Sequence, residues 1–102
     1  MEHLLQNLQK TIKALEILSE KGLPQSEQLD ELLDQLFQQK IDLQDLTMNT
    51  SSPVYQQASQ ALGQTAARAE KATRDTNQVR DLIPAVNDAI GKLAKLLNNA
   101  GS

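Results

Sequence analysis

The chain has 102 residues, a formal net charge of −3 and a hydrophobic fraction of 39%, and it contains no cysteine. The lack of cysteine excludes disulfides and zinc-thiolate sites, and the small negative charge gives no general attraction to nucleic acid. No segment approaches the roughly 20 apolar residues of a membrane-spanning helix. We therefore expect one small cytoplasmic domain, and the abundance of leucine, alanine and glutamine favours helices.

The first predicted helix covers about residues 2–21. Apolar residues recur along it at spacings of three and four, which is the pattern of an amphipathic helix. They are Leu5, Leu8, Ile12 and Leu15, with Leu4 and Leu18 widening the stripe. Gly22 fits the left-handed conformation that often follows a last helical turn, and Pro24 cannot continue the helix. The sequence thus predicts a sharp end near Lys21.

The second predicted helix covers about residues 26–48, with Ser26 as its N-cap. Its main apolar stripe consists of Leu29, Leu32, Leu36, Leu43 and Leu46. A second stripe on the adjacent face consists of Leu33, Phe37, Ile41 and Met48. One neighbouring helix cannot cover both faces, so Phe37, Ile41 and Met48 form a secondary interface candidate.

The third predicted helix covers about residues 52–98. Ser52 before Pro53 is the pairing of N-cap and first-turn residue that begins many helices. The residues that follow alternate at spacings of four and three, which is a heptad seam of a and d positions. The seam consists of Ala58, Leu62, Thr65, Ala69, Ala72, Thr76, Val79, Ile83, Val86, Ile90, Leu93 and Leu97. Its side chains are small in the first half and large in the second.

Pro84 interrupts this regular pattern at an outward b position. A proline inside a helix costs about 3 kcal/mol or more, whereas each buried Ile, Val or Leu contributes roughly 1.5–3 kcal/mol. We expect a continuous helix kinked near Pro84, because a reversing loop would ordinarily shift the heptad phase. The alternative is a break near Asp81, which would act as the N-cap of a fourth helix with Pro84 in its first turn.

The fold class that these elements predict is all-α, a single domain over residues 1–102. A helical hairpin packs against the long, kinked third helix in a three-helix, coiled-coil-like bundle; the alternative break gives a four-helix bundle. The third helix would be about 70 Å long and each hairpin helix about 30–35 Å, so half of the seam would stay uncovered. An uncovered apolar stripe usually marks an interface. The predicted partner interface consists of Val79, Leu82, Ile83, Val86, Ile90, Leu93 and Leu97.

No catalytic, cofactor-binding or metal-binding motif is recognisable. His3 is the only histidine. It lacks the additional cysteine or histidine ligands that a zinc or di-iron site needs. The acidic pair Asp30 and Asp34 is typical of a solvated helix face rather than of a calcium loop. Arg68 and Arg74 belong to a short group of basic residues that has no aromatic side chains on which nucleic-acid bases could stack.

The function that the sequence favours is therefore non-enzymatic protein–protein interaction. We expect self-association into a homo-oligomer, or binding of a partner helix along the seam, as in an adaptor, a chaperone-like protein or an assembly subunit. The sequence points to no small-molecule substrate and no nucleic acid. The alternative is peripheral binding to a membrane surface through the amphipathic residues 82–98, where two lysines and no tryptophan make the pattern weak.

Overall fold

The computed structural model describes residues 2–46 and 50–100, and every regular element in these two stretches is helical. The elements are α1 (Glu2–Ser19), α2 (Ser26–Gln44), α3 (Pro53–Arg74), the short 3₁₀ helix η1 (Thr76–Gln78) and α4 (Val79–Ala100). The predicted all-α class is confirmed. The molecule measures 40 × 20 × 19 Å, so a helix of about 70 Å has no place in it.

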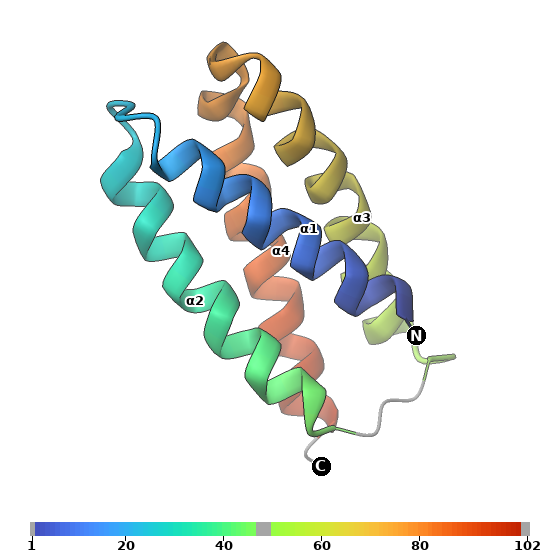
Figure 1. Cartoon of the computed structure of the whole chain (residues 1–102). Coiled ribbons are helices and arrows are strands. Elements are labelled where there is room, and N and C mark those ends of the chain that lie inside the picture. Colours follow the sequence, from blue (N-terminus) through green and yellow to red (C-terminus); the bar gives the residue numbers. More distant parts are fainter. Residues whose placement is uncertain (1, 47–49, 101–102) are drawn as a thin grey trace.

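The four α-helices form a bundle in which α1 packs against α2 and α3, and α4 packs against the same two helices (Figure 1). Helices α1 and α4 are therefore diagonally opposite, as are α2 and α3. Consecutive helices run in opposite directions, and the start of α1 lies beside the start of α3 (Figure 1). Each helix turns its apolar stripe toward the common core.

The predicted continuous third helix is wrong, because the chain reverses direction at Asp75. This residue has extended backbone angles (φ −141°, ψ 95°), and its side chain accepts a hydrogen bond from the backbone N–H of Asn77 at 3.2 Å. Asp75 thus caps η1, which leads directly into α4. The alternative of four helices gave the right number of helices but placed the break at Asp81, inside the first turn of α4.

The alternation of four and three changes phase at Val79, where the next seam position is three residues further on and not four, which is why the phase argument failed. In α3 the buried positions include Ala58, Leu62, Thr65, Ala69 and Ala72, as the predicted seam requires. In α4 the buried positions that follow a heptad are Val79, Leu82, Val86, Ala89, Leu93 and Leu96. Leu82, Ala89 and Leu96 each stand next to another apolar residue. The sequence therefore fits two registers equally well, and the fold uses the one that runs through Leu82.

The helix ends show which local signals were informative. Ser52 is the N-cap of α3, where its hydroxyl accepts the N–H of Tyr55 at 3.1 Å, and Pro53 is in the first turn, as predicted. Gly22 has the expected positive φ of 69°. Ser26 is not an N-cap but the first residue of α2, and its hydroxyl donates to the carbonyl of Ser19 at 3.4 Å.

Candidate functional site

The predicted partner interface on α4 lies mostly in the core of the bundle. Val79, Leu82, Val86, Ile90 and Leu93 are buried within the chain, and Ile83 and Leu97 are partly buried against the core. The prediction assumed that nothing in the chain covers this stripe, and that assumption is wrong. Since α4 folds back along α2 and α3, the stripe forms part of the hydrophobic core and is not presented to a partner.

The secondary candidate on α2 is exposed. The side chain of Phe37 is 40% exposed and that of Ile41 is 56% exposed. Met48, the third member of this candidate, lies outside the described residues. Phe37 and Ile41 are four residues apart, so they are neighbours on one face of α2. Their exposure agrees with the expectation that one neighbouring helix cannot cover both faces of α2.

Three aspartates continue the line of Phe37 and Ile41, two of them on α2 and the third, Asp45, at its C-cap. We call this line the acidic stripe; it consists of Asp30, Asp34, Phe37, Ile41 and Asp45, at spacings of four, three, four and four residues. All five side chains are exposed. The Oδ1 atom of Asp30 accepts a hydrogen bond from the hydroxyl of Ser19 at the end of α1. The stripe is thus an apolar pair with carboxylates at both ends.

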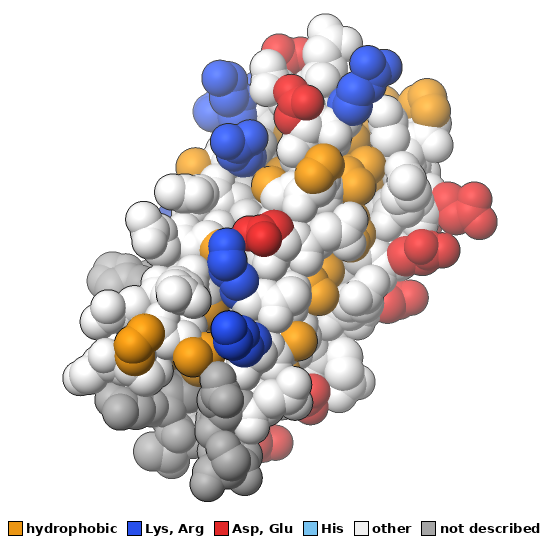
Figure 2. Space-filling view, turned by 180° about the vertical axis from the view of Figure 1, so that it is seen from behind, with side chains coloured by type: hydrophobic (Ala, Val, Ile, Leu, Met, Phe, Trp, Pro, Cys, Tyr) orange, Lys and Arg blue, Asp and Glu red, His pale blue; other side chains and the backbone are white. Residues whose placement is uncertain are grey.

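Charge is unevenly distributed over the molecule. Between Ser26 and Asp45 the chain has six acidic residues and one basic residue, Lys40. Acidic side chains follow the edge that α2 forms, and most basic side chains on the same view lie over α3 and α4 (Figure 2). The net charge of the whole chain is −3, so the region outside residues 26–45 has a net charge of +2, from −3 − (−5). A protein that binds α2 would therefore meet a local negative field.

Ile17 on α1 is another exposed apolar side chain with charged neighbours, and it is 43% exposed. We call the line formed by Lys10, Lys13 and Ile17 of α1 and by Lys21 in the turn that follows it the basic stripe; all four side chains are exposed. The Nζ atom of Lys21 donates to the carbonyl of Thr73 at 2.7 Å, near the end of α3.

A cleft of about 220 Å³ opens beside Ile17, between α1 and α3. Its lining includes Lys10, Lys13 and Ala14 of α1 and Glu70, Thr73 and Arg74 of α3. Sequence reasoning missed this surface. Ile17 does not belong to the core stripe of α1, and an isoleucine with a lysine four residues away on both sides was the available signal.

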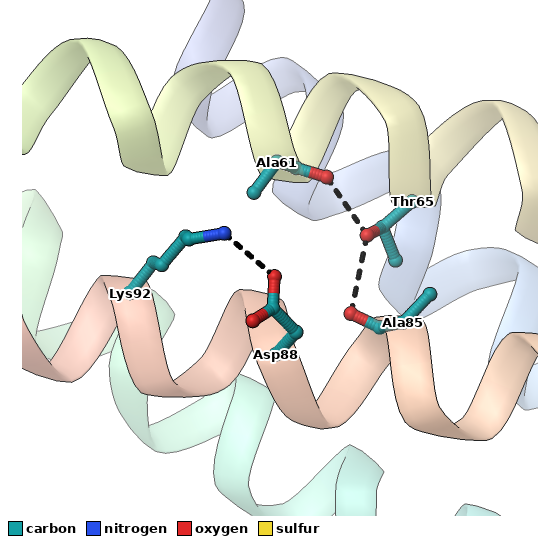
Figure 3. Close-up of polar contacts among 5 residues, drawn as sticks. All are labelled: Ala61, Thr65, Ala85, Asp88 and Lys92. Carbon is teal, nitrogen blue, oxygen red and sulfur yellow. Dashed lines mark hydrogen bonds and ion pairs between the residues drawn. The ribbon is translucent and has the colours of Figure 1, made fainter.

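A hollow of about 780 Å³ lies between α3 and α4. Thr65 lies at its base, where its hydroxyl donates to the carbonyl of Ala61 at 2.8 Å and reaches that of Ala85 at 3.4 Å (Figure 3). On its rim Lys92 and Asp88 form an ion pair at 2.8 Å. Its charged groups are exposed or half-buried, so the groove offers no water-excluded site for acid–base chemistry.

Gln39 and Tyr55 are buried side chains with polar groups. Gln39 of α2 donates its Nε2–H to the carbonyl of Ile90 at 2.9 Å, while its Oε1 atom has no hydrogen-bond partner among the described residues. Burial raises the pKa of Tyr55 above its usual value of 10.0, so its phenol stays neutral at physiological pH. Neither residue lines a described cleft. We therefore assign both of them to the packing of the core.

Within the described stretches, no group of three or more His, Cys, Asp or Glu side chains is placed to hold a metal ion. His3 belongs to α1, but its side chain is outside the part of the molecule that the structure describes. The described helices also include none with the length and apolar character needed to cross a membrane.

Comparison of the chain with models of protein families, with curated proteins and with solved structures yields no match. Functional inference therefore depends on the surface of the bundle itself.

Proposed function

We propose that this chain is a non-enzymatic protein-binding module whose binding surface is the acidic stripe of α2. The observation that supports this most directly is the joint exposure of Phe37 and Ile41 on one helical face, with Asp34 on one side and Asp45 on the other. Exposed apolar side chains within a charged rim are the usual anatomy of a binding site. Aromatic side chains near the centre of such a site commonly contribute most to affinity.

The chemistry of the stripe defines the partner. The surface that covers Phe37 and Ile41 must be apolar, and it must place positive charge opposite Asp30, Asp34 and Asp45. A helix with an apolar row and lysine or arginine on its flanks has this arrangement. This proposal keeps protein binding as the function and moves the surface from α4 to α2.

The seam of α4 and membrane binding are weaker candidates. Both need the apolar side chains of residues 82–98, and most of these side chains are buried in the core. Their exposure would require α4 to leave the bundle, which would open the core along its whole length. We therefore base the proposal on the side chains that are already exposed.

The proposal is tested with a synthetic amphipathic helical peptide that has one leucine row flanked by lysines. Backbone amide resonances are followed by NMR as the peptide is added to the labelled protein. We expect shift changes concentrated on α2 between Asp30 and Asp45. The double variant Phe37→Ser/Ile41→Ser should bind at least about tenfold more weakly, because the apolar anchors are lost.

Two controls separate specific binding from nonspecific binding. A peptide with glutamate in place of each lysine should produce no shifts, because its charge repels the aspartates. The variant Ile17→Ser changes an exposed apolar residue outside the acidic stripe, and it should bind the lysine peptide as the native chain does. Equal binding by the Phe37→Ser/Ile41→Ser variant would contradict the proposal.

A further inference from the structure

We propose that the partner of the acidic stripe is the basic stripe of a second copy of this chain, an inference that rests on the proposed function. Ile17, Phe37 and Ile41 are the large apolar side chains that the described part of the molecule exposes. Ile17 has Lys13 and Lys21 four residues away on either side, whereas Phe37 and Ile41 have Asp34 and Asp45 at the two ends of their line. The molecule thus presents two complementary surfaces, each with the charge that the other requires.

The two stripes have matching layouts. The basic stripe extends over 12 residues from Lys10 to Lys21, about 16 Å at the helical rise, and the acidic stripe over 16 residues from Asp30 to Asp45, about 22 Å. Each has its apolar residues in the interior of the line and charges at both ends. When the two helices lie side by side, Ile17 can meet Phe37 and Ile41 while lysines and aspartates pair on either side.

The cleft beside Ile17 offers a place for an aromatic ring. Its volume is about 220 Å³, whereas an apolar cavity of about 150 Å³ in a protein is large enough to hold benzene. Ala14 contributes a small side chain to the cleft wall, and the aliphatic parts of Lys10 and Lys13 add apolar surface. The ring of Phe37 from a second copy therefore fits the cleft in size, with Ala14 and Ile17 as its apolar contacts and the charged side chains of the lining around it.

The two stripes cannot meet within one chain. Ile17 lines a cleft that α1 forms with α3, whereas Asp30 accepts a hydrogen bond from Ser19 where α1 faces α2. The stripes are consequently on opposite sides of α1, and their contact requires two molecules. An interface made of two helix faces of these lengths is at the small end of specific interfaces. We therefore expect a dissociation constant on the order of 100 μM.

The test begins with the mass of the full chain by sedimentation equilibrium, from about 10 μM to 1 mM, the range in which such a weak contact becomes populated. The average mass should rise above the 11.2 kDa of one chain as concentration increases. Raising the salt concentration from about 0.05 M to 0.5 M should lower the average mass, because it screens the charge pairs. A mass of 11.2 kDa throughout this range would overturn the inference, and the peptide experiment would still decide the proposed function separately.

Charge reversal then identifies the surfaces. One variant, Asp34→Lys/Asp45→Lys, makes the α2 surface basic, and another, Lys10→Glu/Lys13→Glu, makes the α1 surface acidic. Each variant alone should remain monomeric, because its two surfaces now have the same sign. A 1:1 mixture of the two should associate at least as strongly as the native chain, since opposite charges again face each other.

The matched control is Glu31→Lys/Asp42→Lys, which changes the net charge as much as the first variant does but leaves the acidic stripe intact. It should associate like the native chain. All of these substitutions are at exposed positions, and circular dichroism verifies that each variant keeps its helices. Association that survives both reversals, or a mixture that stays monomeric, would overturn the pairing of the two stripes.

Discussion

Gln39 places a polar amide in the core where α2 meets α4. One end of this amide donates to the carbonyl of Ile90, and the other end, Oε1, has no partner among the described residues. A buried acceptor without a partner costs about 1–3 kcal/mol, while the hydrogen bond that Nε2 makes contributes about 0.5–1.5 kcal/mol. We therefore predict that Gln39→Met, which keeps the length of the side chain, raises the free energy of unfolding by about 1 kcal/mol.

Denaturant unfolding measures this change, and Gln38→Met is the matched control. Gln38 is exposed, and its Nε2 donates to Oδ1 of Asp42 at 3.1 Å, so its replacement should change stability by less than about 0.5 kcal/mol. A clear loss of stability in Gln39→Met would mean that both ends of the amide are satisfied in the folded protein.

Polar residues were also where the sequence was least informative about the core. The apolar periodicity identified Leu8, Ile12 and Leu15 as core positions, and all three are buried. Gln39 is also buried, although neither apolar stripe predicted for its helix includes it. Burial follows from the orientation of the whole helix, and a single polar side chain cannot reveal it.

At the scale of a helix, Pro84 interrupts the hydrogen bonding of α4. It lies inside the helix at an exposed position, where its ring nitrogen cannot donate to the carbonyl of Arg80 and its ring crowds that carbonyl. A bend of α4 at this point stays a prediction. We expect Pro84→Ala to raise the free energy of unfolding by about 2 kcal/mol, after allowance for the greater freedom of the unfolded chain.

The control is the other helical proline, Pro53. It occupies the first turn of α3, where a missing N–H is harmless and the fixed φ suits the helix. Pro53→Ala should therefore be neutral or should lower stability by up to about 1 kcal/mol. Thermal or denaturant unfolding of both variants is the measurement. Equal effects of the two substitutions would contradict the interruption of α4 by Pro84.

The ends of the helices were predictable where a residue has a special backbone or capping role. Gly22 and the pair Ser52 and Pro53 are such residues, and the structure places turns or helix ends at all of them. The reversal at Asp75 has only the aspartate itself as a capping residue. No glycine or proline stands near it, and Thr76 fits the heptad seam, so the local sequence resembles a continuing helix.

For the whole molecule, closure of the bundle decides which apolar surface remains available. A long third helix would have left the stripe of α4 exposed. In the closed bundle α4 is covered by α2 and α3, and the exposed large apolar side chains among the described residues are Ile17, Phe37 and Ile41. The sequence could identify the stripe of α2 because it lies on a second apolar face of that helix. The choice between the stripes of α2 and α4 required knowing where the chain reverses.

Closure of the bundle can be measured as a distance in solution. Gln57 of α3 and Lys92 of α4 line the same groove, whereas in a continuous helix they would be about 52 Å apart. The native chain has no cysteine, so Gln57→Cys/Lys92→Cys accepts two spin labels without further changes. Pulsed electron paramagnetic resonance should give a distance below about 25 Å, since packed helices have axes about 8–10 Å apart.

The control for this measurement is a pair of labels within one helix. Gln57→Cys/Arg74→Cys places both labels on α3, and their distance should be about 25 Å whichever way the chain continues after Arg74. This pair shows that the labels report helix geometry faithfully. A distance near 50 Å between positions 57 and 92 would restore the continuous helix, and with it the stripe of α4 as the first candidate for binding.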